Sequence, residues 1–333
     1  MKKIILFFLI GILIVFTGDL LINAFGPVQI LRLAKYKNVV TVNCYPQWIN
    51  DEEYCYLEVT NYNDGGTGPG FGIMPVPCSF FWGKISNADF SIYKVNINKP
   101  SEKILVKKIS ERVAFTLWGE KINGDEILFK ISTDKRRMAL ILRIPIGLIG
   151  YDYRSYFLDI NGNIFEKKLL SWEWRDHMKI SDLSFDLDKV SLIDFNDFYI
   201  KDMISNSITK WSNYGRWISK TKSINYSLYP EVLKVYLENE QGADCELVYE
   251  LHYKEYGAIK DLLWDATISE NSSILFLNKI GIFEKKDGKW QIVKESQNMP
   301  NFYYPAISPN GQRLVGIKDG QKVVALELKE LLR

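Results

Sequence analysis

The stretch Tyr304-Pro305-Ala306-Ile307-Ser308-Pro309-Asn310-Gly311-Gln312-Arg313-Leu314-Val315 decides the fold of this chain, because degraded copies of it recur along most of the sequence. It reads as a short strand, a Pro-Asn-Gly turn and a second, apolar strand. A good copy lies ~40 residues earlier, with Ile268, Ser269 and Asn271 in the places of Ile307, Ser308 and Asn310. Weaker copies are centred on Asp51, Asn123, Asp188 and Glu231. Such a repeat indicates an architecture but no particular chemistry.

The spacing of the copies predicts a propeller. From position 188 onward the spacing matches the ~40 residues of one four-stranded blade, and the longer earlier spacings fit single blades with inserted loops or an extra strand. We therefore predict an all-β protein in which residues 26–333 form a β-propeller of four-stranded antiparallel blades, with six blades preferred and seven as the alternative. The last copy supplies only three strands, so we expect the N-terminal strand from Val28 to Leu33 to close the ring.

The order of residues in the repeat resembles the WD-repeat-like blades of TolB-type six-bladed propellers. The match is close at 304–317 and fair at 265–277 and 46–57. The usual Asp-Gly turn of that family is replaced by Asn310-Gly311 in one copy and by Ser272-Ser273 in the preceding one. The resemblance implies a bacterial envelope protein that works through binding, and it indicates no particular partner.

The N-terminus is typical of an export signal. Lys2 and Lys3 precede an unbroken apolar run from Ile4 to Phe16, which fits the core of a signal peptide. A spanning helix needs about 20 residues, and the run reaches that length only if it continues past Asp19 to Phe25. Residues 1–25 are therefore either a cleaved signal peptide or an inner-membrane anchor at 4–25. Both alternatives place the body of the protein in the periplasm or another extracytoplasmic space.

Charge and metal-ligand content exclude several functions. The chain has 42 basic and 40 acidic residues and a net charge of +2, without a basic block, so we expect neither nucleic acid nor an anionic membrane surface as a partner. The two histidines, His177 and His252, are too few for a typical zinc site. The sequence indicates no metal and no cofactor.

Four cysteines would meet an oxidising compartment after export: Cys44, Cys55, Cys78 and Cys245. We predict a disulfide between Cys55 and Cys78, with Cys44 as the rival partner of either and Cys245 unpaired. The alternative is four buried free thiols, which are common in protein cores.

Two aromatic segments are candidates for binding. A glycine-rich loop from Asn61 to Cys78 exposes Phe71 and Met74 to a partner, or else packs against its own blade. A polar-aromatic cluster contains Trp172, Trp174 and Arg175, which can stack on a sugar or peptide and bind a carboxylate. Trp211 and Trp217 bracket a similar connection. For all these tryptophans the alternative is a wedge between blades.

We expect a non-catalytic binding or scaffolding module of the cell envelope, whose partner is a protein, a peptide or a glycan. The first alternative is a carbohydrate-active propeller, either glycosidase-like or lectin-like, and the second is a purely structural remnant of a peptidase-type propeller whose catalytic partner is encoded separately. An enzyme of this kind should show three or more carboxylates in one open funnel, at least two of them about 5–10 Å apart, and the candidates near the inner strands are Asp182, Asp186, Asp188 and Asp265. The aspartates of the repeat turn are equally explained by local backbone hydrogen bonding, so we expect no catalytic residue.

Overall fold

The structure is a computed structural model, and it describes residues 38–63, 85–114, 117–118, 121–122, 127–146, 150–170, 179–194, 197–211, 215–220, 222–229, 232–239, 245–252, 266–278, 280–295, 302–318 and 322–332. Within these residues the chain is almost entirely β-structure. Its helical part is α3 (Leu328–Leu331), which follows the last strand. No helix of the described ranges, which begin at residue 38, is long and apolar enough to cross a membrane.

The first half of the described chain forms three antiparallel sheets of four strands each, which we number as blades. Blade 1 contains β1 (Asn38–Trp48), β2 (Glu53–Asn63), β3 (Ile85–Asn96) and β4 (Lys103–Ala114). A small hairpin follows, formed by β5 (Leu117–Trp118) and β6 (Lys121–Ile122). Blade 2 contains β7 (Ile127–Ile131), β8 (Arg137–Ile146), β9 (Gly150–Asp159) and β10 (Ile164–Leu170). Blade 3 contains β11 (Lys179–Leu183), β12 (Lys189–Asp194), β13 (Asp197–Asp202) and β14 (Ile208–Trp211).

The second half forms two more four-stranded sheets and one of three strands. Blade 4 contains β15 (Gly215–Trp217), β16 (Lys222–Tyr229), β17 (Val232–Asn239) and β18 (Cys245–His252). Blade 5 contains β19 (Ala266–Ile268), β20 (Ile274–Leu277), β21 (Gly281–Lys286) and β22 (Lys289–Glu295). Blade 6 contains β23 (Phe302–Ile307), β24 (Arg313–Lys318) and β25 (Lys322–Glu327). The prediction of an all-β propeller with six blades is confirmed.

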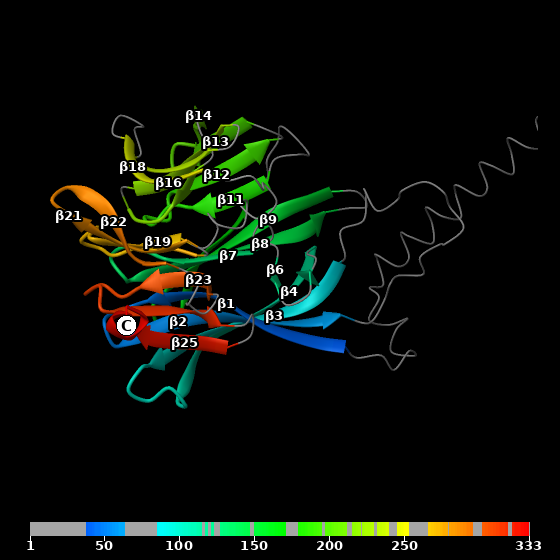
Figure 1. Ribbon diagram of the computed structural model, residues 1–333. Helices are drawn as coiled ribbons and strands as arrows, with labels where there is room; N and C mark the ends of the chain where they lie inside the picture. The colour runs from blue at the N-terminus through cyan, green and yellow to red at the C-terminus, as the bar shows by residue number, and fades with distance from the viewer. Residues whose placement is uncertain are drawn as a thin grey trace, which may run out of the picture.

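The blades pack face to face around a ring. One apolar cluster joins blades 1, 2 and 3, a second joins blades 4 and 5, and a third joins blades 5 and 6. A fourth cluster joins blade 1 to blade 6, and Figure 1 shows β23 and β25 beside β1 and β2. Burial of apolar area between sheets therefore holds the ring together and brings the two ends of the described chain into one interface.

A single turn explains the sequence repeat. In four blades a buried serine directly follows the first strand. The serine N–H donates to the carbonyl of the residue five positions later at 2.8–2.9 Å, and the serine Oγ accepts the N–H of that later residue. The serine carbonyl accepts the N–H three residues later, and that residue has a positive φ. These turns begin at Ser132, Ser184, Ser269 and Ser308. Gly311 adopts the positive φ at little cost, whereas Lys135, Leu187 and Ser272 adopt it against their side-chain preference.

Two predicted copies of the repeat are wrong. The copy predicted at Asn123 precedes β7, whose five residues are all buried, so β7 is the first strand of blade 2 and the true turn begins at Ser132. The copy predicted at Glu231 falls between β16 and β17, and the first turn of blade 4 lies near Ser219. In the sequence, a polar turn between the first and second strands of a blade cannot be distinguished from a polar turn between later strands. The innermost strand is recognised by the burial of its residues, which the structure shows.

Blade 6 supplies three strands among the described residues, as predicted, with β25 at its outer edge. The strand expected at Val28 to Leu33 and the apolar segment at 4–25 both lie outside the described residues. Closure by the N-terminal strand therefore stays a prediction. The contacts of blade 6 with blade 1 are direct: Arg313 Nη1 donates to the carbonyl of Asp51 at 2.8 Å, and the Asn310 N–H donates to Asp51 Oδ1 at 2.9 Å.

Candidate functional site: the central channel

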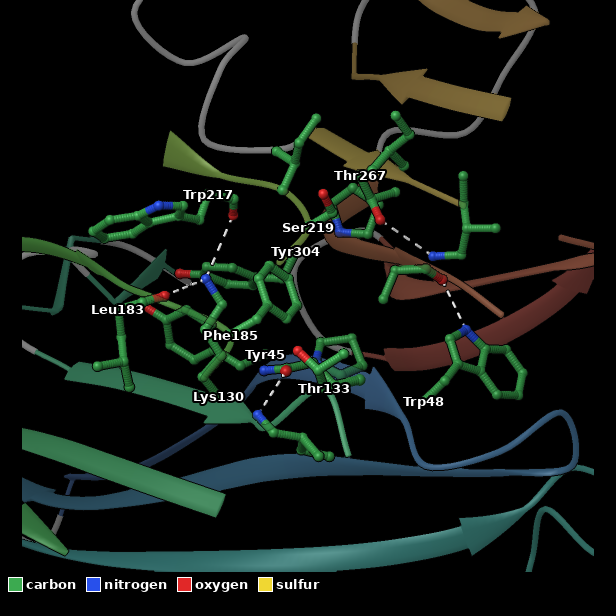
Figure 2. A pocket seen from close by; sticks show the side chains of 18 of the residues that line it. Tyr45, Trp48, Lys130, Thr133, Leu183, Phe185, Trp217, Ser219, Thr267 and Tyr304 are labelled. Carbon is green, nitrogen blue, oxygen red and sulfur yellow. Dashed lines mark hydrogen bonds between the residues drawn. The ribbon is translucent and has the colours of Figure 1, made fainter. Parts of the chain in front are cut away.

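Residues on or next to the innermost strands of the six blades line a cavity of about 140 Å³, and Figure 2 shows part of that lining. Every blade contributes to its wall. The lining residues from blades 1, 2 and 3 are Tyr45, Pro46, Gln47, Trp48, Leu128, Phe129, Lys130, Ile131, Thr133, Lys135, Asp182, Leu183 and Phe185. Those from blades 4, 5 and 6 are Trp217, Ile218, Ser219, Lys220, Ala266, Thr267, Ile268, Glu270, Tyr304, Pro305, Ala306 and Ile307.

One end of the cavity is surrounded by the serine turns, and we call Thr133, Lys135, Phe185, Lys220 and Glu270 the channel mouth. Lys135 Nζ lies 3.3 Å from Glu270 Oε1. Lys135 belongs to blade 2 and Glu270 to blade 5, and these blades are opposite each other in a ring of six, so this ion pair crosses the mouth. A second ion pair joins Lys220 of blade 4 to Asp186 of blade 3 at 3.1 Å. The mouth thus carries two ion pairs between blades, Lys135–Glu270 and Lys220–Asp186.

Two tyrosines lie deeper, because they come earlier in their inner strands than the residues of the mouth. Tyr45 in β1 and Tyr304 in β23 have φ of 52° and 51°, each precedes a proline, and each sits at an irregularity in strand pairing. Their ring centroids are 4.4 Å apart. A positive φ costs an aromatic residue roughly 1–3 kcal/mol and persists only where the surrounding structure enforces it. The paired bulges direct both rings toward the channel.

A buried ion pair forms part of the wall. Lys130 Nζ lies 3.0 Å from Asp182 Oδ1 and donates to the carbonyls of Leu183 and Trp217 at 2.5 Å and 3.4 Å. Asp182 also accepts the N–H groups of Leu183 and Trp217, both at 2.8 Å. The Lys130 ammonium lies 4.2 Å from the centroid of the Phe185 ring. This network joins blades 2, 3 and 4 and satisfies both charges, as burial requires.

Side chains also join three other pairs of neighbouring blades at the channel: 1 and 2, 1 and 6, and 5 and 6. Gln47 bridges to blade 2, donating to the Phe129 carbonyl at 2.7 Å and accepting the Ile131 N–H at 2.8 Å. Trp48 Nε1 donates to the Ala306 carbonyl of blade 6 at 2.8 Å, and Thr267 Oγ1 accepts the Ile307 N–H at 3.3 Å. Figure 2 shows Trp48 and Trp217 at opposite sides of the view, with Phe185, Tyr45 and Tyr304 between them.

Both carboxylates that line the described cavity already have bonding partners. The two carboxylates that line the described cavity are Asp182 and Glu270. Asp182 is fully engaged by Lys130 and two backbone N–H groups, and Glu270 is paired with Lys135. The Asp186 carboxylate pairs with Lys220, and Asp188 accepts the Ser184 hydroxyl at 2.8 Å. Asp265 lies outside the described residues.

The structure describes only some of the binding residues predicted from the sequence. Phe71, Met74, Trp172, Trp174 and Arg175 lie outside the described residues, so their roles stay predictions. Asn61–Asn63, predicted as the start of the glycine-rich loop, belong to strand β2. The backbone of Trp211 ends β14, the outer strand of blade 3.

Trp217 is not the exposed stacking platform that one interpretation predicted. Its side chain is only 2% exposed, and its backbone N–H and carbonyl bind the Asp182–Lys130 pair between blades 3 and 4. An indole in that position fills space in the interior, which is the alternative that the sequence left open.

The predicted disulfide is not formed at Cys55. Cys44 and Cys55 are buried free thiols, 1% and 0% exposed, Cys245 is an exposed free thiol, and Cys78 lies outside the described residues. The side chain of Cys55 belongs to the apolar cluster between blades 1 and 2, which separates it from the surface. Burial raises the pKa of the Cys55 thiol to about 12, and burial likewise raises the pKa of Cys44.

These thiols should differ sharply in reactivity. Because Cys245 is exposed whereas Cys44 and Cys55 are buried, iodoacetamide at pH 8 should modify Cys245 in the native protein, and Cys44 and Cys55 only after unfolding. Partial burial and the nearby Glu238 raise the pKa of Cys245, so its modification should be slow. Peptide mass spectrometry of native and denatured samples measures this difference. Recovery of a peptide in which Cys55 is linked to Cys78 would contradict the buried-thiol arrangement.

Of the channel lining, Asp182 and Trp217 are candidates from the sequence, whereas Lys130, the two tyrosines and the Lys135–Glu270 pair are not. Lys130 is the one charged residue in the run Ile127–Ile131 (ILFKI), a signal of a buried, paired charge. The dipeptide Tyr-Pro occurs at Tyr45-Pro46, Tyr229-Pro230 and Tyr304-Pro305, and the first and last of these stand ahead of the turn in their copies of the repeat. Lys135 and Glu270 carry no such signal, because their pairing depends on which blades face each other. No group of three or more His, Cys, Asp or Glu side chains suited to a metal occurs among the described residues.

No protein-family model matches the sequence, and no curated protein matches it either. Solved structures with a similar arrangement include TolB from Acinetobacter baumannii, at 11% identity and a TM-score of 0.38, over 73% of this chain and 63% of that one. The C-terminal WD40 domain of Sif2 has 9% identity and a TM-score of 0.41, over 89% and 84% of the two chains. An acylaminoacyl peptidase has 10% identity and a TM-score of 0.42, over 84% of this chain. The chain spans 49% of the length of that peptidase.

Proposed function

We propose that this protein is an exported cell-envelope propeller that acts as a non-catalytic binding or scaffolding module, and that it takes a segment of a partner protein or peptide at the channel mouth. The observation that carries the proposal is the cavity itself. All six inner strands build it, its mouth is lined by charges on rigid turns, and two aromatic rings in strained backbone conformations lie deeper. Concave sites with apolar walls and a few directed polar groups are typical binding sites.

The two carboxylates that line the channel already have partners, and this favours binding over catalysis. A general acid or base must reach the proton that it transfers. Asp182 already accepts from Lys130 and two N–H groups, and Glu270 is held by Lys135. The channel is therefore better suited to holding a group than to transforming it.

Export is supported by the sequence of the N-terminus, where Lys2 and Lys3 precede the apolar run from Ile4 to Phe16. We place the propeller on the extracytoplasmic side, either free after cleavage or attached through residues 4–25. The partner is then an envelope protein or peptide.

A capture experiment tests the proposed function. The full chain is used as bait on detergent-solubilised envelopes, beside the variant Thr133→Trp and a variant lacking residues 64–77. Thr133 is exposed at the mouth, so a tryptophan there should obstruct the channel without lowering the melting temperature. We expect the wild type to capture a partner that Thr133→Trp does not.

The other outcomes are distinct. Equal capture by wild type and Thr133→Trp would contradict the channel as the binding surface. If only the deletion variant fails to capture the partner, the binding surface is the glycine-rich loop and not the channel. Failure of every bait to capture a protein, together with binding in a glycan screen, would favour the carbohydrate alternative.

A further inference from the structure

We propose that the ligand group of the channel is the C-terminal residue of a peptide chain, with an aromatic side chain inside the cavity and its α-carboxylate on Lys135 in place of Glu270. This inference rests on the proposed function and names the chemistry of its ligand. Glu270 would then act as an internal substitute that occupies the carboxylate position while the channel is empty.

The Lys135–Glu270 pair is asymmetric in a way that favours an incoming anion. The Lys135 side chain is 28% exposed and that of Glu270 is 55% exposed. The Lys135 backbone is fixed by its positive φ of 58° and by its N–H, which donates to the Ser132 carbonyl at 2.9 Å. When the pair opens, Glu270 can turn into water at little cost, whereas Lys135 stays at the mouth. The group left without its partner at the mouth is thus a cation.

The other charges around the cavity also favour a negatively charged ligand. The cavity lining carries three ammonium groups, on Lys130, Lys135 and Lys220, against the carboxylates of Asp182 and Glu270. Asp182 is committed to Lys130, and Asp186, just outside the lining, pairs with Lys220. Displacement of Glu270 therefore leaves one net positive charge at the mouth, which a carboxylate would neutralise and a second cation would worsen.

The aromatic part of the ligand follows from what lies below the mouth. Phe185 lines the cavity beside Lys130, and Tyr45 and Tyr304 lie deeper. Rings that pack at offset or tilted angles favour a further aromatic group in contact with them. The strained backbone at both tyrosines is of the kind found at ligand clamps. A cavity of about 140 Å³ suits one large side chain.

A chain terminus fits better than an internal acidic residue. In a C-terminal residue the carboxylate and the side chain leave the same Cα, so one residue supplies both the anion and the ring. An internal Asp or Glu would require a second residue for the ring and would require the chain to enter and leave through the same mouth.

The test uses the full chain and two synthetic probes, acetyl-Ala-Ala-Phe with a free carboxylate and the same peptide with a C-terminal amide. Binding is followed through the NMR signals of the peptide ring during a protein titration. We expect the acid to bind about 10-fold or more tightly than the amide, because a hydrogen bond to a charged group is involved. Equal affinity of acid and amide, or no binding of either, would overturn the inference.

Two variants of the same ion pair should then change affinity in opposite directions. Lys135→Met should abolish the preference for the acid, whereas Glu270→Gln should tighten acid binding about 3-fold or more by removing the internal competitor. Lys168→Met, which opens an exposed pair with Glu166 on β10, is the matched control and should change nothing. Loss of affinity in both Lys135→Met and Glu270→Gln would indicate a structural pair and contradict the inference.

These outcomes are separate from those of the capture experiment. If the acid and the amide bind the wild type equally well and neither binds Thr133→Trp, the channel remains a binding surface. Only the proposed recognition of a carboxylate is then refuted. Should Lys135→Met fail to fold, the sign of the Glu270→Gln effect decides by itself.

Discussion

Replacing Asp182 with alanine should lower the free energy of unfolding by about 3–5 kcal/mol, because it leaves Lys130 charged and buried without its partner. Lys130 and Asp182 have side chains only 9% and 5% exposed. The variant also removes the acceptor of the N–H groups of Leu183 and Trp217. Urea unfolding followed by tryptophan fluorescence measures the loss.

A matched control separates burial from charge. Asp186→Ala opens the pair with Lys220, whose side chains are 40% and 55% exposed, and should cost about 1 kcal/mol or less. The double variant Lys130→Met with Asp182→Leu should recover part of the stability that Asp182→Ala loses, since no unpaired charge remains. A loss below about 1 kcal/mol in Asp182→Ala would show that water reaches the pair and would contradict the buried network.

Replacing Trp48 with alanine should cost about 3–5 kcal/mol and should weaken the contact between the first and last blades. The Trp48 side chain is 3% exposed, it packs in the cluster shared by blades 1 and 6, and its Nε1 donates to the Ala306 carbonyl at 2.8 Å. The variant therefore leaves a cavity and an unpaired acceptor at one interface. Thermal melting followed by circular dichroism measures the effect.

Two further variants test this explanation. Trp48→Phe keeps most of the apolar volume and loses the hydrogen bond, so it should cost about 1–2 kcal/mol. Trp290→Ala removes a partly exposed indole on the outer strand β22 and should have a smaller effect than Trp48→Ala. An equal loss of stability in Trp290→Ala and Trp48→Ala would show that the interface between blades 1 and 6 contributes no more to stability than the outer strand of blade 5.

The fold was predictable because one hydrogen-bonded turn demands particular residues. Serine at its first position binds backbone groups, and glycine or a tolerant residue takes the positive φ three positions later. Where the sequence keeps both residues, as at Ser308 and Gly311, the copy is recognisable. Where a lysine or leucine takes the positive φ, as at Lys135 and Leu187, the sequence pattern predicts no copy or predicts one in the wrong register. Tertiary contacts enforce the turn there, and local sequence does not reveal them.

The site was less predictable, because it is formed by residues brought together by the ring. Sequence reasoning looked for exposed aromatics in long loops, yet the channel uses Tyr45 and Tyr304, which are 259 positions apart in the chain and adjacent in space. Lys130 was predictable in principle, as a charge inside an otherwise apolar inner strand. The Lys135–Glu270 pair depends on the opposition of blades 2 and 5, which requires the correct blade boundaries first.

Site-specific photo-crosslinking tests the central claim most directly. A benzophenone amino acid is placed at Lys220 in the channel mouth, and in a second protein at Lys168, which is exposed on the outer strand β10. Each full-length protein is irradiated in the envelope fraction that yields the captured partner. We predict a covalent adduct with the partner from position 220 and none from position 168. An adduct from position 168 without one from position 220 would contradict the assignment of the channel as the binding surface.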